Sequence, residues 1–252
     1  MCSNYRPVTR LDRLLTFFGV ERPRDEAPQD VFPLGLAPFI RLRRAAPGAA
    51  SDRVVEDGIF GLLPGFASEV AYGRKTYNAR SESVASLPSF RPSWRTGQRC
   101  IVPAECFFEP CWETGKAVRW RIAQAGDVPM GIAGVYARWR HPDGREMASF
   151  AMLTVNADGH PLMQRFHRPG EEKRMVVILA PEDYAAWLTC SVAEAPRFLR
   201  RWEGPLEATP EPLPPRAPGA GSVRTVRPSP RAGSAEREDR DDRPPGETGR
   251  LF

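Results

Sequence analysis

Hydrophobic and polar positions alternate over several short stretches of this chain, and that period of two is typical of strands with one buried face. The alternation is strictest over residues 118–122, Val-Arg-Trp-Arg-Ile. Further apolar stretches of strand length occupy residues 39–42, 54–63, 101–108, 132–136, 149–155 and 176–179. Gly-Asp and His-Pro-Asp-Gly turns connect neighbouring stretches, where a parallel sheet would need helical crossovers. We therefore expect a mostly antiparallel sheet.

Two stretches instead space their apolar residues three or four apart, as an amphipathic helix does. The first follows Thr9, ends at Gly19 and carries Leu11, Leu14, Leu15 and Phe18. The second begins at Pro181 and carries Tyr184, Trp187 and Leu188. A sheet with a few short helices predicts the α+β class.

The composition changes at residue 205. Residues 205–252 hold ten prolines among Ala, Gly, Ser and charged residues, with few large apolar side chains. Such a segment buries too little surface to offset its ordering entropy, so we expect a domain over residues 1–204 and a disordered tail over 205–252. Eight Arg and eight acidic residues cancel within the tail, which leaves the formal charge of +5 on residues 1–204. A basic domain of this kind can hold a polyanion.

The five cysteines are odd in number and follow no secretory leader, so we expect free thiols in a reducing cytoplasm. Cys100, Cys106 and Cys111 lie close together, but no second cluster or nearby His completes a zinc set. We therefore expect no metal or other cofactor. No apolar run approaches the ~18 residues of a membrane span, so we expect a soluble monomer without a membrane partner.

The start of the chain, Met1-Cys2-Ser3, offers a reactive group. Cysteine is small enough for the initiator methionine to be trimmed, which leaves Cys2 with a free α-amine beside its thiol. With pKa values of about 7.7–8.0 and about 8.5, both groups are nucleophiles near neutral pH. An aldehyde suits this pair, because the amine forms an imine and the thiolate closes a five-membered thiazolidine. A Cys2 without function fits the sequence about equally well.

The three histidines differ in their surroundings. His141 and His160 lie in turns that contain Pro and Gly, where we expect solvated side chains. His167 lies among basic residues, which favour its neutral form and attract a phosphate. A surface histidine in a basic loop is the ordinary alternative.

Three other residues suit substrate binding or proton transfer. The amide of Asn78 can orient a substrate, and the guanidinium of Arg80 matches the geometry of a phosphate. Glu109 ends the apolar run of residues 101–108, where a raised pKa allows a carboxyl to act as acid and base. An ordinary helix start and a strand-end charge in water are the alternatives.

These residues belong to a series of elements that resembles the SRAP family, the SOS response-associated peptidases. The elements are Cys2, Asn-Ala-Arg-Ser-Glu at 78–82, Phe-Arg at 90–91, Arg-Cys-Ile-Val-Pro-Ala-Glu at 99–105, Phe-Phe-Glu at 107–109, Ile-Ala-Gly-Val-Tyr at 132–136, and His167 before Arg-Met at 174–175. Phe-Gly-Leu-Leu-Pro at 60–64 looks like the family's Trp-Gly-Leu-Ile-Pro element. The resemblance covers residues 2–190, and the order of so many elements makes it specific.

The resemblance implies a barrel-like β core and a sensor of abasic sites in single-stranded DNA. The sensor links covalently to the ring-opened sugar through a thiazolidine, as a cysteine peptidase or hydrolase with lyase-like activity in the response to DNA damage. By position, Cys2 supplies both nucleophiles, Asn78 orients the adduct, Glu109 shuttles protons and His167 assists ring opening. The residues that the resemblance assigns to DNA binding are Arg80, Arg168 and Arg174 for phosphates, and Phe60 and Phe90 for stacked bases.

The chain departs from the family pattern at several positions. Pro110 follows Glu109 where Trp is usual, and Val176 stands where Pro is expected. The interval between His167 and Arg174 is longer than in the family, so both Arg168 and Arg174 stay candidates for the second phosphate contact. Two other functions fit the composition: an N-terminal-nucleophile cysteine hydrolase that acts on amides, and a non-catalytic single-strand binder.

Overall fold

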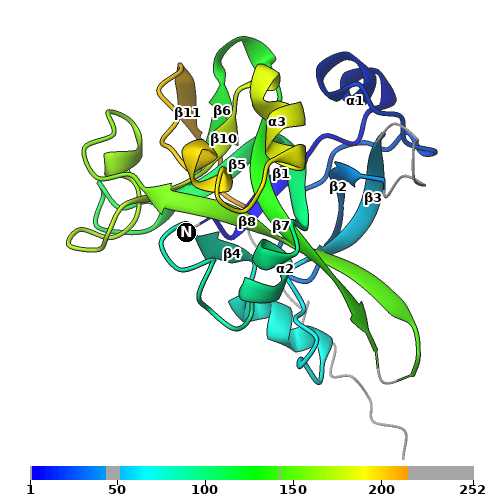
Figure 1. Cartoon of the computed structure of the whole chain (residues 1–252). Coiled ribbons are helices and arrows are strands. Elements are labelled where there is room, and N and C mark those ends of the chain that lie inside the picture. Colours follow the sequence, from blue (N-terminus) through cyan, green and yellow to red (C-terminus); the bar gives the residue numbers. More distant parts are fainter. Residues whose placement is uncertain (1, 44–51, 142, 215–252) are drawn as a thin grey trace, which may run out of the picture. The chain divides into compact units, whose positions relative to one another are not determined.

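The computed structural model describes residues 2–43, 52–141 and 143–214. Its elements are β1 (Asn4–Pro7), α1 (Leu11–Phe18), β2 (Leu36–Leu42), β3 (Arg53–Phe60), η1 (Val70–Lys75), β4 (Asn78–Arg80), α2 (Arg91–Arg95), β5 (Arg99–Cys111), β6 (Val118–Gln124), η2 (Ala125–Asp127), β7 (Met130–Arg140), β8 (Glu146–Asn156), η3 (Met163–Arg165), β9 (Arg174–Val176), β10 (Ile178–Leu179), η4 (Pro181–Asp183), α3 (Tyr184–Thr189), η5 (Ala195–Phe198) and β11 (Leu206–Pro210), where η marks a 3-10 helix. The strands gather at the centre and the helices lie around them (Figure 1).

Five strands close into a barrel in the order β7, β8, β3, β2 and β5, because β5 pairs with both β2 and β7. Only the pairing of β3 with β8 is parallel within this ring. The predicted α+β class with a mostly antiparallel, barrel-like sheet is confirmed. The long strand β5 also carries β1 and β6 beyond the ring, so it connects the barrel to the start of the chain.

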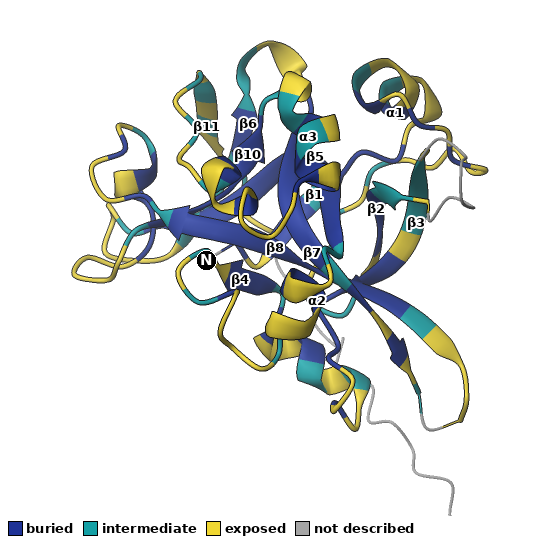
Figure 2. Cartoon of the chain, viewed as in Figure 1, coloured by how far each residue is buried: buried dark blue, intermediate teal, exposed yellow. Residues whose placement is uncertain are grey.

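The core lies within the barrel, and Figure 2 shows that its strands are largely buried. The rings of Phe39 and Phe60 each lie 5.5–5.6 Å from the ring of Phe150, and all three side chains are fully buried. Each such ring contributes about 1.5–3 kcal/mol of hydrophobic stabilisation. Strand β3 is buried at its end on both faces, which explains why residues 58–60 show no polar alternation.

The predicted first helix is confirmed as α1, but Thr9 does not cap it. The Thr9 hydroxyl instead donates to the carbonyl of Glu26 at 2.7 Å. The backbone N–H of Leu11 donates to the Asp25 carboxylate at 3.1 Å, so a distant loop supplies the acceptor at the helix start. Gly19 ends the helix with φ of +63°, as the sequence predicts.

The folded domain extends past the boundary predicted at residue 204. Strand β11 pairs antiparallel with β6, from Leu206 opposite Gln124 to Pro210 opposite Trp120. The next residue, Glu211, forms an ion pair with Arg6 at 2.8 Å. The compact unit therefore runs to Leu213. The remainder of the predicted tail, 215–252, lies outside the described residues. Within the described part of the chain, no helix has the length and apolar character needed to cross a bilayer.

Candidate active site at the N-terminal strand

Strand β1 brings the start of the chain to the end of β5. In this antiparallel pair Asn4 lies opposite Phe108 and Tyr5 opposite Phe107, so the register leads Cys2 towards Glu109. Cys2 is 1% exposed, and its Sγ donates a hydrogen bond to the carbonyl of Asn4 at 3.4 Å. The thiol is therefore enclosed within the sheet, beside the carboxyl end of β5.

Asn78 contacts residue 2 directly. It begins β4, which pairs in parallel with β8 and lies beside the N-terminal end of the chain (Figure 1). The Nδ2 group of Asn78 donates to the carbonyl of Cys2 at 2.7 Å. Its Oδ1 is buried and accepts no hydrogen bond from any described residue. The amide thus holds Cys2 in place and keeps one acceptor for a further donor.

Glu109 and His167 complete the cluster from two distant parts of the chain. Both are buried, and Nε2 of His167 lies 3.4 Å from Oε2 of Glu109. His167 adopts φ of +64°, a conformation rare for a residue with a side chain, and its backbone N–H donates to the carbonyl of Pro110 at 3.0 Å. This strained turn is one of the places where function is expected to reside.

Burial in the cluster shifts the pKa values of its three titratable members, Cys2, Glu109 and His167. Burial raises the pKa of Glu109 to about 7, so its carboxyl is present in both forms near neutral pH. Burial, with the charge of Lys173 as a lesser cause, lowers the pKa of His167 to about 4 and keeps the imidazole neutral. Burial and the negative charge of Glu109 raise the pKa of the Cys2 thiol far above its usual value. The protonated thiol therefore needs a base, and Glu109 lies close to it.

Tyr77 belongs to this site, although the sequence analysis did not select it. Its ring is half-buried and lies edge-on against Phe60 at 5.7 Å. Burial, followed by the charges of Cys2 and Glu109, raises its pKa, which indicates that the phenol lies near both groups. The position of Tyr77 immediately before Asn78 was the signal in the sequence that could have pointed to it.

The three arginines expected at phosphates occupy different environments. Arg80 is half exposed and pairs with Glu172 at 2.9 Å. Arg168 is exposed, and its guanidinium lies 4.6 Å from the centre of the Trp112 ring. Arg174, by contrast, is 2% exposed and is held by the carboxylates of Glu82 and Glu172, at 2.9 and 2.8 Å. Arg80 and Arg168 are therefore accessible to a ligand, whereas Arg174 serves the fold.

The expected stacking role of Phe60 and Phe90 does not agree with their burial. Their side chains are 0% and 4% exposed, because Phe60 fills the barrel and Phe90 packs into the core. Neither ring has a free face for a base. Phe66 is instead 59% exposed, and its ring lies edge-on against Tyr72 at 5.6 Å.

His160 also differs from the expectation of a solvated turn. It is 7% exposed, and its Nδ1 accepts hydrogen bonds from the backbone N–H groups of Leu162 and Met163, at 3.2 and 3.1 Å. Its Nε2 lies 2.9 Å from the carbonyl of Trp202. The ring thus joins the start of η3 to the C-terminal segment. His141 lies half-buried in its turn, 2.8 Å from the Asp143 carboxylate.

Comparison with known protein families gives a match to the model of the SOS response associated peptidases (SRAP) over residues 1–210. The chain belongs to the SRAP family. A crystal structure of a protein from Bordetella bronchiseptica has 38% identity to it and a TM-score of 0.75, over 84% of this chain and all of the other. A structure from Bacteroides thetaiotaomicron shares the fold, with 23% identity and a TM-score of 0.68, over 82% of this chain and 90% of the other.

Curated relatives of this SRAP chain carry the name abasic site processing protein. YoqW of Bacillus subtilis is 30% identical over 152 residues, which cover 59% of this chain and 63% of YoqW. YobE of the same species is 32% identical over 51% of this chain and 56% of its own length. HMCES of Rattus norvegicus is 23% identical over 53% of this chain and 45% of its own length. Each alignment thus spans less than two thirds of the relative. Among the described residues, no group of three His, Cys, Asp or Glu side chains could hold a metal ion.

Proposed function

We propose that this protein recognises abasic sites in DNA and links covalently to the ring-opened sugar through a thiazolidine at Cys2. The names of the curated relatives support the substrate. The chemistry is supported by one observation above all: Cys2, Asn78, Glu109 and His167 come from four separate stretches of sequence and meet in one buried cluster.

The reaction needs only the amine and thiol of Cys2. Removal of Met1, by methionine trimming or by self-cleavage, frees the α-amine. The neutral amine attacks the C1′ aldehyde, and the resulting carbinolamine takes up a proton and loses water to give a protonated imine. The Cys2 sulfur, after giving up its proton, adds to the carbon of the protonated imine, and the five-membered ring closes with a neutral N–H. The net change is the loss of one water molecule, without oxidation or reduction.

Glu109 supplies the proton transfers. With a pKa of about 7, its acid form protonates the leaving hydroxyl of the carbinolamine. The carboxylate formed in that step then accepts the proton of the thiol, whose own raised pKa prevents spontaneous ionisation. Reversal of the link uses the same transfers in the opposite order.

Asn78 orients Cys2, and His167 assists the opening of the sugar ring. Asn78 fixes the Cys2 carbonyl, and its buried Oδ1 accepts a hydrogen bond from the freed α-amine. Neutral His167 lies 3.4 Å from Glu109, where it can accept the proton of the C1′ hydroxyl as the C1′–O4′ bond breaks and return that proton to O4′.

The DNA strand approaches along exposed groups of the domain, two of which, Arg80 and Arg168, lie close in sequence to Asn78 and His167. Arg80 and Arg168 bind backbone phosphates, because both are accessible guanidiniums. Phe66 offers an exposed ring on which an unpaired base can stack. A single strand suits this arrangement, since its bases and sugars are free to turn towards the protein.

The decisive experiment incubates the purified protein with a single strand that carries one abasic site and separates the products on a denaturing gel. We expect a covalent band with the wild type and none when the aldehyde is first reduced to an alcohol. Cys2→Ser should lose the stable band and should cleave the strand instead, because its imine persists and permits β-elimination. Intact mass should lack Met1. A wild-type protein that shifts the strand only on a native gel would be a binder, and one that hydrolyses amides without a covalent band would be an N-terminal-nucleophile hydrolase.

A further inference from the structure

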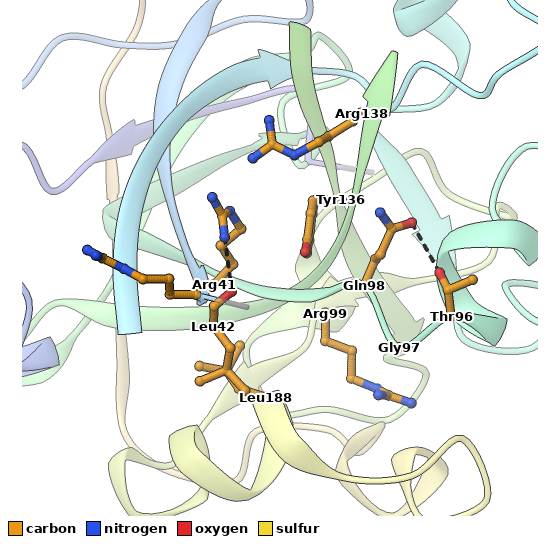
Figure 3. Close-up of a pocket in the computed structure, with 10 residues that line it drawn as sticks. Arg41, Leu42, Thr96, Gly97, Gln98, Arg99, Tyr136, Arg138 and Leu188 are labelled. Atoms are coloured by element: carbon orange, nitrogen blue, oxygen red, sulfur yellow. Dashed lines mark hydrogen bonds between the residues drawn. The ribbon is translucent and has the colours of Figure 1, made fainter. Parts of the chain in front are cut away.

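A polar cavity of about 880 Å³ lies at the opposite end of β5 from the cluster around Cys2 (Figure 3). It lies where β5 begins, beside the end of β2 and the extension of β7. Ile40 of β2 lies opposite Ile101, so Leu42, the last residue of β2, is level with Arg99, the first residue of β5. On the other side, β7 pairs with Arg99 through Val135 and continues to Arg140. Side chains at the end of β2 and along the extension of β7 therefore line the cavity beside the start of β5.

Three guanidiniums border this cavity. Arg41 and Arg43 lie two residues apart along the line of β2 and so share a face, and Arg138 projects over the cavity from β7 (Figure 3). Glu56 pairs with two of them: one of its oxygens lies 2.5 Å from Arg41 and 2.9 Å from Arg138. Arg43 forms no side-chain ion pair within the described part of the chain. Three cations against one carboxylate leave two positive charges at the rim.

The donors at the rim are only partly used. Arg41 donates from Nε to Glu56 and from one terminal nitrogen to the carbonyl of Leu42, and Arg138 donates once, to Glu56. Each guanidinium carries five N–H donors, so most of them stay available for a planar or tetrahedral oxyanion. Among the described residues, no Asp or Glu lines the cavity.

The floor adds a neutral donor and an aromatic face. The Oε1 of Gln98 accepts from Thr96 at 3.2 Å, which leaves its NH₂ group for a ligand (Figure 3). Tyr136 presents a half-buried ring beside it. Arg99 is part of the wall rather than a ligand group: it donates to the carbonyls of Cys190 and Ser191, and its guanidinium lies 5.5 Å from the rings of both Trp94 and Trp187.

We propose that this cavity is a second anion-binding site, which takes the phosphate group of a nucleotide or of a nucleic-acid strand through Arg41, Arg43 and Arg138. Its volume lies within the range of about 300–1,000 Å³ that is typical of small-molecule sites, and Tyr136 offers a ring for a base. The site is independent of the chemistry at Cys2. The ten residue steps of β5 from Arg99 to Glu109 correspond to roughly 30 Å of extended strand.

The test titrates the full-length protein with a fluorescently labelled ATP and follows anisotropy at low salt, with pyrophosphate, unlabelled ATP, adenosine and a short intact single strand as competitors. We expect saturable binding that the phosphate compounds displace and adenosine does not. Arg138→Ala should weaken the labelled ATP by about tenfold. Its matched control is Arg140→Ala, which removes the same charge from the same strand outside the cavity and should change the affinity less than about twofold.

Two further variants separate this site from the one at Cys2. Glu56→Gln should tighten binding of labelled ATP, because it removes the carboxylate that, within the described part of the chain, pairs with Arg41 and Arg138. Cys2→Ser should bind labelled ATP as the wild type does, even where it forms no covalent link to DNA. Displacement by the intact strand as strong as by ATP assigns the site to a DNA backbone, and displacement by ATP and pyrophosphate alone assigns it to a free nucleotide. Equal losses in Arg138→Ala and Arg140→Ala, displacement by adenosine, or no saturable binding overturns the proposal.

Discussion

The pKa values of Glu109 and His167 shift in opposite directions, because burial disfavours the charged form of each side chain. The folded protein keeps the proton of Glu109 up to about pH 7, whereas the unfolded chain loses it near 4.5, so this residue's contribution to stability falls as the pH rises between those values. The unfolded chain takes up the His167 proton near pH 6.5 and the folded protein only near about 4, so that contribution falls as the pH decreases. The two effects oppose each other between about pH 4.5 and 6.5.

The substitution Glu109→Gln should therefore separate the pH effect of Glu109 from that of His167. Relative to the wild type, its free energy of unfolding should improve steadily from pH 4.5 to about 7, by about 3 kcal/mol in total, because the amide avoids the cost of burying a charge. The free energy of unfolding of His167→Gln should increase relative to that of the wild type as the pH falls from 6.5 to about 4. Urea unfolding of the three proteins across this range measures both differences. Differences that do not change with pH would contradict the assigned shifts.

Arg80 and Arg174 should respond differently to replacement by alanine. Arg80 is half exposed, so Arg80→Ala should weaken binding of intact and abasic single strands alike and lower the salt slope by about one, with little change in melting temperature. Arg174 is buried and ion-paired, so Arg174→Ala should lower stability by about 1–3 kcal/mol through the loss of its bonds to Glu82, Glu172 and Thr154. Salt-dependent anisotropy and thermal melting distinguish the two roles. A melting temperature lowered equally by both substitutions would contradict this division.

Side-chain accessibility was the part of the site that the sequence could not predict. Residue type and the family resemblance selected Cys2, Asn78, Glu109 and His167 as candidates, and the fold brings them together. The resemblance also placed a stacking ring at Phe60, which fills the barrel. A strand buried on both faces has no period from which to tell an inward ring from an outward one.

The segment after His167 shows how one side chain can organise a loop. This chain has a longer interval there than the family pattern, and Lys173 bridges it. Its Nζ donates to the carbonyls of Phe166, His167 and Arg168, at 2.9, 3.3 and 2.9 Å. These bonds converge on the residue with φ of +64°, so the ammonium group holds His167 in its strained conformation.

Lys173→Ala should release this loop and slow covalent linkage about tenfold, while affinity for an intact strand changes little. Lys173→Arg keeps a donor and should recover part of the rate. The measurement is the linkage rate at saturating abasic strand, with the melting temperature as the control for folding. A loss of affinity at an unchanged linkage rate would assign Lys173 to DNA binding rather than to positioning.

Individual strands could be predicted from the sequence, but the closure of the barrel could not. Alternation and turns indicate which segments are extended and antiparallel to their neighbours. The pairing of β5 with β1, β2 and β7 joins residues far apart in the chain, and no local pattern encodes it. Strand β11 was missed because Pro205 and Pro210 flank it and only Leu206 and Ala208 pack against the core.

At the scale of the whole molecule, β11 and Glu211 make the C-terminal segment part of the domain that presents Cys2. Glu211 pairs with Arg6 of β1 at 2.8 Å and with Arg119 of β6 at 3.7 Å, and Asp30 pairs with the same two arginines. The guanidinium of Arg119 also lies 3.3 Å from the centre of the Phe108 ring, next to Glu109. The end of the folded chain therefore supports the strand on which the reactive cysteine lies.

Two truncations test where the domain ends. Removing residues 215–252 keeps β11 and Glu211, so it should leave the melting temperature and the rate of covalent linkage nearly unchanged. Removing residues 206–252 deletes the β11 ladder and the ion pairs of Glu211, so it should lower the melting temperature by several degrees and slow linkage through a less ordered β1. Glu211→Gln in the full-length protein is the matched control, because it removes only the charge and should cost about 1 kcal/mol or less. If both truncated proteins melt and link like the full-length chain, β11 does not support the site and the domain ends near residue 204, as its composition alone suggests.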